Sequence, residues 1–146
     1  MDYIKNLYKS LEKNTDLIGL NISNPVFSKS SYHTIESDNF IIVGIAGKTN
    51  GIITLELDEK TLDYFSESMI PDESMRTDYM TMSAISEFLN MVSGNFLILS
   101  NLNDSELTPP ISATGKNIKA ILNNFETKRI YFSTEGSEAV LSLSLR

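Results

Sequence analysis

The chain has 146 residues, of which 41% are hydrophobic and 21% charged, as expected for one soluble globular domain. Its formal net charge of −7 and the lack of any basic run argue against nucleic acid and anionic membrane surfaces as partners. There is no cysteine, which excludes disulfides and suits a cytoplasmic location. No secretion signal is recognisable at the N-terminus, and the apolar runs are too short to predict a membrane span.

Helical spacing and β-rich runs divide the first half of the chain into expected elements, which are a helix over residues 3–11, a strand over 18–27 and a hairpin of strands 39–47 and 52–58. The hairpin is predicted by the turn sequence Asn50-Gly51 between its two strands. In the second strand Ile53, Leu55 and Leu57 alternate with polar residues. One face of that strand is therefore expected to be buried.

The second half of the chain is divided in the same way into a helix over residues 59–69, a long helix over 77–99, an extended segment after Pro109-Pro110 and a hairpin of strands 128–133 and 139–146. Asp58 is placed to cap the first of these helices, and Pro71 follows its end. The alternation of Leu141, Leu143 and Leu145 indicates a terminal strand at a sheet edge. The predicted fold is one α/β domain of the α+β type, with long helices packed on a largely antiparallel sheet.

The helix expected over residues 77–99 has two lines of residues at helical spacing. An apolar stripe, expected to pack on the sheet, consists of Met82, Ile85, Leu89, Val92, Phe96 and Leu99. A second line, called here the polar ridge, consists of Ser83, Glu87, Asn90 and Gly94. A glycine at the end of this ridge would let another backbone or a partner approach closely.

Exposure to water is one explanation of the polar ridge, because any surface helix has a polar side. Three features favour a function instead. The ridge has no Lys or Arg beside Glu87, and it uses Asn and Ser where Ala, Lys or Gln would form a better helix. Glu87 and Asn90 are also three residues apart, so they point the same way.

The segment SAISEFLNMVSGN, residues 83–95, resembles the ExxN signature of the CheX/CheC/FliY phosphatases of bacterial chemotaxis. Glu87 and Asn90 match its two fixed positions, and Ser83 matches the Asp or Ser that precedes the Glu by four. LTPPISATGKN is similar to a later family segment in which a Pro precedes a short strand. Only one copy of the signature falls on a helix, as in the CheX branch. The resemblance implies a CheC-like fold and a single CheX-like phosphatase domain over residues 1–146.

The resemblance also implies a reaction, in which the phospho-aspartate of a CheY-like response regulator is hydrolysed. In that reaction Asn90 would orient the attacking water and Glu87 would pair with a lysine of the regulator's active site. Ser83 and Gly94 would let the polar ridge fit into the regulator's cleft. The regulator would supply Mg²⁺, so no intrinsic cofactor is expected, and a homodimer is expected because CheX-type proteins form one.

Other candidate groups give weaker indications. His33, in SKSSYHT, is interpreted as a loop residue, and the acidic pairs Asp72-Glu73 and Asp104/Glu106 as caps and loops. With one His, no Cys and no clustered carboxylates, no metal site is expected. Two alternatives to a phosphatase stay open, which are a non-catalytic binding or scaffold module and a structural subunit of a flagellar switch.

Overall fold

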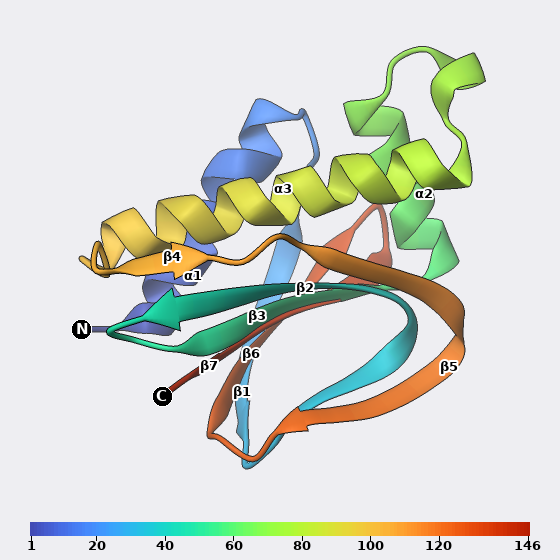
Figure 1. The fold of residues 1–146 in the computed structure, drawn as a ribbon. Coiled ribbons are helices and arrows are strands. Elements are labelled where there is room, and N and C mark those ends of the chain that lie inside the picture. Colours follow the sequence, from blue (N-terminus) through green and yellow to red (C-terminus); the bar gives the residue numbers. More distant parts are fainter.

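A computed structural model describes all residues from 1 to 146 (Figure 1). The helices are α1 (Tyr3–Leu17), α2 (Glu59–Met69) and α3 (Asp78–Leu99), and a 3-10 turn, η1, spans Glu73–Met75. The strands are β1 (Ser23–Ser30), β2 (His33–Gly47), β3 (Gly51–Leu57), β4 (Ser105–Leu107), β5 (Ile111–Asn123), β6 (Thr127–Thr134) and β7 (Ser137–Leu145).

The strands form one sheet in which every pair is antiparallel, and the helices lie together on one face of it (Figure 1). The strand order is β1-β6-β7-β3-β2-β4, and β5 pairs with β2. The predicted fold class is therefore confirmed. The expected place of the terminal strand is wrong, because β7 pairs with both β3 and β6 inside the sheet. Alternating side chains reveal the buried face of a strand, but they do not reveal its neighbours. The free edges belong to β1, β4 and β5.

Both predicted helix starts in the middle of the chain are confirmed. The side chain of Asp58 accepts a hydrogen bond from the backbone N–H of Thr61 at 2.8 Å, which caps α2. Thr77 accepts in the same way from the N–H of Met80 at 3.2 Å, which caps α3. Such caps satisfy N–H groups that lack a partner within the first turn of the helix, so a short local pattern is enough to predict them.

Helix α1 is longer than the apolar spacing indicated, and the strand expected from residue 18 begins only at Ser23. The added turns contain Asn14 and Thr15, which are buried although they are polar. Their side chains donate hydrogen bonds to the carbonyl oxygens of Ser10 and Leu11, four residues back in the helix. Polar side chains that donate to carbonyl groups of their own helix can enter the core, although the amide oxygen of Asn14 has no partner there, and this hides the helical pattern.

Helix α3 supplies much of the hydrophobic core. Five members of the predicted apolar stripe are buried, and so are Phe88 and Leu97. Leu99 does not belong to it: it is 45% exposed, because the buried part of the helix ends with Phe96 and Leu97. By length and composition α3 could also cross a membrane, but this is weak evidence because a buried core helix meets the same criteria.

The face of the sheet away from the helices is also covered. The first half of β2, residues 33–37, pairs with residues 118–123 of β5, and this two-stranded arm curls back beneath the sheet (Figure 1). The arm covers Thr54 and Glu56, which are 0% and 5% exposed. The predicted burial of the apolar face of β3 is confirmed, since Ile53, Leu55 and Leu57 are at most 2% exposed, but the opposite face is buried too. A distant part of the chain covers the polar face as well.

His33 is the clearest difference from the sequence analysis, because it is a buried residue at the start of β2 and not a loop residue. Its two ring nitrogens lie 2.6 Å from Ser144 Oγ and 2.8 Å from Thr54 Oγ1. Burial, together with the nearby Arg129, lowers the pKa of His33 to about 4. The ring is therefore neutral at physiological pH, where it joins the arm to β3 and β7 through one donated and one accepted hydrogen bond.

A buried ion pair lies beside this histidine. Arg129 and Glu56 approach to 3.7 Å, and the guanidinium also donates to Ser142 Oγ at 3.0 Å and Thr34 Oγ1 at 2.8 Å. Burial raises the pKa of Glu56, while Arg129 acts in the opposite direction. The arm is thus held against the sheet mainly by hydrogen bonds between polar side chains.

Candidate functional site

The polar ridge lies on the side of α3 that faces the connection between β4 and β5 (Figure 1). At one end, Ser83 and Glu87 line a hollow of about 320 Å³ together with Pro110 and Ser112. At the other end, a Cβ atom built on Gly94 would stand 3.9 Å from the side chain of Leu107 in β4. The polar ridge therefore belongs to one rigid helix, and the segment from β4 to the start of β5 lies beside both of its ends.

The two matched signature residues are available to a partner. Glu87 is exposed and Asn90 is half-buried. Neither side chain makes a hydrogen bond or an ion pair with another residue of the chain, and the amide of Asn90 is not among the buried polar groups without a partner. A polar side chain that stabilises a fold usually has an internal partner. The hydrogen-bonding capacity of Glu87 and Asn90 is instead directed to water or to another molecule.

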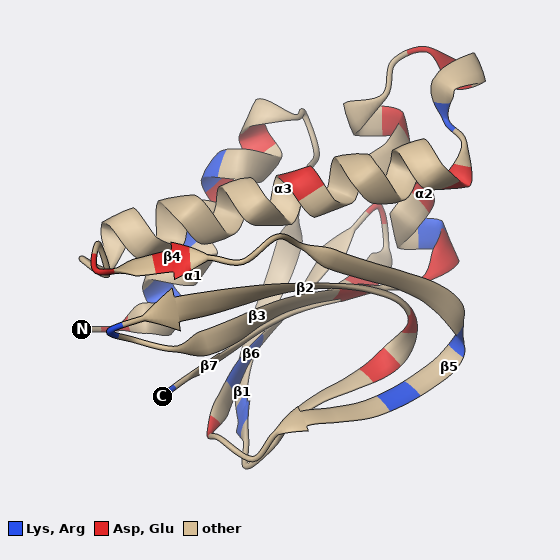
Figure 2. Ribbon diagram, in the orientation of Figure 1, with Lys and Arg blue, Asp and Glu red and all other residues tan.

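The charge on this side of the molecule is acidic. The only charged residues of α3 are Asp78, in its first turn, and Glu87, near its middle, and the helix carries no basic residue (Figure 2). Glu106 on the adjacent strand β4 is a further exposed carboxylate. A lone carboxylate with no cation beside it attracts a basic group from outside the chain.

Gly94 is not required by the fold of the chain itself. Its φ is not in the left-handed region, and an added Cβ would meet only Leu107, at an ordinary contact distance. Glycine within a helix costs about 1 kcal/mol relative to alanine. The half-buried Gly94 therefore weakens α3 without an internal reason, and it leaves the helix backbone open to close approach from outside.

Some residues of the hollow that adjoins the polar ridge were not among the predicted site residues. Tyr79, which is 81% exposed, lines it together with Ser86, and so does Ser112 from β5. Tyr79 precedes Ser83 by four residues, so the spacing of the ridge already included it. Ser112 lies close to α3 because the chain passes beside this helix after β4, and no local sequence pattern predicts that path.

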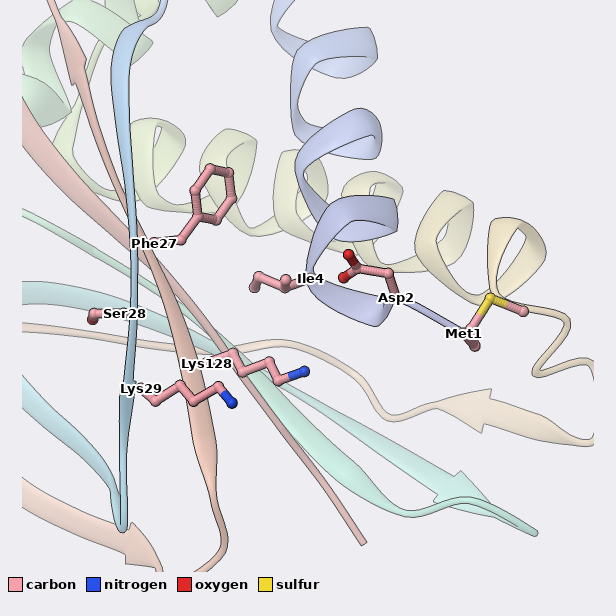
Figure 3. Close-up of a pocket in the computed structure, with 7 residues that line it drawn as sticks. All are labelled: Met1, Asp2, Ile4, Phe27, Ser28, Lys29 and Lys128. Carbon is pink, nitrogen blue, oxygen red and sulfur yellow. The ribbon is translucent and has the colours of Figure 1, made fainter.

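Another hollow, of about 560 Å³, lies between the start of α1 and the strands β1 and β6 (Figure 3). It is lined by apolar side chains, by Asp2 and by Lys29 and Lys128, which are opposite each other on the two strands. It shares no residue with the polar ridge. No group of three or more His, Asp or Glu side chains is placed to hold a metal ion.

Comparisons with known proteins agree with the resemblance seen in the signature segment. The family model described as chemotaxis phosphatase CheX matches residues 40–133, well over half of the chain. This range contains the whole of α3 and with it the polar ridge. No match was found among curated protein sequences.

Three solved structures illustrate the similarity of the fold. A putative chemotaxis protein from Desulfovibrio vulgaris Hildenborough has a TM-score of 0.86 at 18% identity, covering 100% of this chain and 97% of the other. CheX from Desulfovibrio desulfuricans has a TM-score of 0.84 at 20% identity, covering 100% of both chains. A chain of the CheX–CheY–BeF3–Mg²⁺ complex from Borrelia burgdorferi has a TM-score of 0.79 at 19% identity, covering 100% of this chain and 99% of the other.

Proposed function

Because this chain belongs to the CheX family of chemotaxis phosphatases, we propose that it hydrolyses the phospho-aspartate of a CheY-like response regulator. The observation that carries the proposal is the pair Glu87 and Asn90. They stand one turn apart on α3 without any partner inside the chain. The proposal implies a cytoplasmic protein, because the regulators of two-component signalling act in that compartment.

The reaction needs little from the phosphatase. The oxygen of a water molecule attacks phosphorus in line with the bond to the aspartyl oxygen, that bond breaks, and the carboxylate leaves with the bonding electrons. The proton of the water passes to the departing inorganic phosphate. Asn90 orients the water, because its amide both donates and accepts hydrogen bonds and does not titrate. This is the role of the glutamine that positions water in GTPases.

Glu87 serves docking more than chemistry. Its carboxylate pairs with the lysine of the regulator's active site, which fixes α3 against the cleft and draws the lysine from the phosphoryl group. Ser83 and Gly94, one turn before Glu87 and one turn after Asn90, are small enough for the helix to enter the cleft. Mg²⁺ supplies charge neutralisation at the phosphoryl group, and it is held by acidic residues of the regulator.

The crystallised CheX–CheY complex from Borrelia burgdorferi supports the choice of partner, because it joins a protein of this fold to CheY with Mg²⁺ and BeF3. The alternative is a non-catalytic module that binds a signalling partner. A module of that kind would have no need for an unpaired Asn90 beside Glu87, and turnover distinguishes the two functions.

The decisive experiment measures phosphate release from a phosphorylated CheY-like protein with wild-type chain and with Asn90→Ala. Loss of one preorganised hydrogen-bonding group in the transition state should lower the rate at saturating phosphatase by about 10²- to 10³-fold. Affinity should change far less, because Glu87 carries the docking. The thermal midpoint should hold or rise slightly, because alanine is the better helix former.

Unchanged turnover in Asn90→Ala would rule out the proposed mechanism. Lost turnover together with a lowered thermal midpoint would make Asn90 a structural residue. Wild-type chain that binds the phosphorylated regulator without releasing phosphate would favour the binding module.

We also propose a homodimer, as the resemblance implies. The terminal strand cannot join the two copies, because β7 has neighbours on both sides. Two other strands offer free edges with exposed apolar side chains, namely β1 with Val26 at 58% and β5 with Ile121 at 73%. Light scattering of wild type, Val26→Lys and Ile121→Lys would identify the edge used, and a wild-type monomer at tens of micromolar would exclude the dimer.

A further inference from the structure

The outer side of α3 around Glu87 is unusually apolar for a helix in water. Met80 and Met91 stand seven residues before and four residues after Glu87, so all three side chains share one side of the helix. Met80 is 38% exposed and Met91 is 44% exposed. Tyr79, at 81%, adds an aromatic ring at the hollow that Glu87 also lines.

This surface lacks the charges that normally keep such a helix in solution. After Asp78, Glu87 is the only charged residue of α3, and no Lys or Arg lies on the helix (Figure 2). Isolated exposed apolar residues need no explanation, but a carboxylate set between two thioethers on one helix face is a distinct arrangement. It has the composition of an interface, in which methionine is enriched and charged residues are few.

We propose that Met80 and Met91 contact the phosphorylated regulator on both sides of Glu87 and exclude water from the pair between Glu87 and the regulator's lysine. This inference rests on the proposed function and extends it to two further residues that set affinity. An ion pair in water contributes little, whereas one surrounded by apolar contacts is screened far less by solvent and salt. Apolar neighbours that keep water from a central contact are typical of strong interface residues.

Methionine is well suited to this role. Its unbranched thioether has three rotatable bonds, so it follows the shape of a partner without a fixed pocket. The helix holds Met80 and Met91 on the same rigid element as Glu87, so their positions relative to the carboxylate do not depend on loops. Their role is to position and desolvate the charge pair, and not to touch the phosphoryl group.

The first test measures binding of a CheY-like receiver domain loaded with beryllofluoride and Mg²⁺. Met80→Ala and Met91→Ala should each raise Kd by roughly 5- to 10-fold. Turnover at saturating phosphatase should stay within about twofold, because Asn90 is intact. Leu17→Ala is the matched control, since Leu17 is a 66% exposed apolar residue at the end of another helix, and its Kd should not change.

The second test separates desolvation of Glu87 from simple apolar contact. Met91→Ala should make binding more sensitive to salt, because the charge pair becomes open to solvent. In the background of Glu87→Gln, where no charge pair forms, the same substitution should have a clearly smaller effect on Kd. A substitution that only altered the fold would act equally in both backgrounds.

The outcomes distinguish this inference from the proposed function. Wild-type chain without binding or phosphate release would refute both. Normal wild-type activity with unchanged Kd in both methionine variants, or equal effects with and without the Glu87 charge, would overturn the methionine contacts alone. A change of oligomeric state in Met91→Ala on light scattering would also overturn them, because the surface would then belong to a second copy of the chain.

Discussion

Replacing Gly94 with alanine separates the two reasons for which a glycine occurs within a helix. If Gly94 served the fold, alanine would collide with a neighbour or strain the backbone. The added Cβ instead meets only Leu107, at 3.9 Å, and the backbone is helical. Gly94→Ala should therefore stabilise the protein by about 1 kcal/mol, the difference in helix propensity. For a chain of this size that corresponds to a rise of about 3 °C in the thermal midpoint.

The same methyl group should impair the reaction. It stands on the polar ridge one turn beyond Asn90, where the proposed function brings the regulator against the helix backbone. A displacement of about 1 Å at a reacting site can lower a rate by about 10²-fold. We expect kcat/KM for phosphate release to fall at least tenfold while thermal stability rises, measured by a phosphate-release assay and by calorimetry on the same preparations.

Asn95→Ala is the matched control, because Asn95 is the next residue of α3, is half-buried and lies outside the polar ridge. It should give a smaller gain in stability and leave turnover unchanged. A more stable Gly94→Ala protein with full activity would refute the idea that the glycine makes room for a partner. A less stable protein would show that Gly94 serves the packing of α3.

Three further expectations concern charge, pH and metal. Glu87→Ala should weaken binding of the phosphorylated regulator by about 2–5 kcal/mol, measured by titration, with the fold intact; unchanged affinity would exclude the pairing with lysine. Because the folded pKa of His33 is lowered from 6.5 to about 4, its contribution to stability is complete above pH 6.5 and is lost as the pH falls toward 4, by up to about 3 kcal/mol. The free energy of unfolding of His33→Gln, measured with urea, should not show this decrease at low pH. The raised pKa of Glu56 makes the free energy of unfolding fall as the pH rises, but it does so in both proteins and cancels when they are compared. EDTA should stop phosphate release yet leave the thermal midpoint of the isolated chain unchanged, whereas a lowered midpoint would reveal a metal bound to this chain.

Features set by neighbours in sequence could be predicted from the chain. The cap at Asp58, the start of α3 near Thr77 and the hairpin at Asn50-Gly51 depend on residues only a few positions apart. The interior position of β7 depends instead on its pairing with the distant strand β3, and the burial of His33 depends on the arm folding beneath the sheet. Contacts of that kind join residues about a hundred positions apart, and periodicity carries no information about them.

The same distinction applies to the candidate site. The line from Ser83 to Gly94 lies on one helix, so its geometry follows from helical spacing alone. Pro110 and Ser112 approach Glu87 from another part of the chain, and only the fold shows that they share a hollow with it. The exposure of Met80 and Met91 could not be predicted either, because an apolar residue in a helix is expected in the core until its neighbours are known.

The interior place of β7 has a consequence for the order in which the protein can form during synthesis. Ribosomes deliver the chain from its N-terminus, so β7 emerges after all the other strands. Until then β3 and β6, which both pair with β7, cannot be joined into one sheet. The helices and the hairpin of β2 and β3 can form earlier, but their apolar surfaces stay partly uncovered. Folding of this chain is therefore expected to be completed only after β7 has left the ribosome, with nascent intermediates that benefit from chaperones.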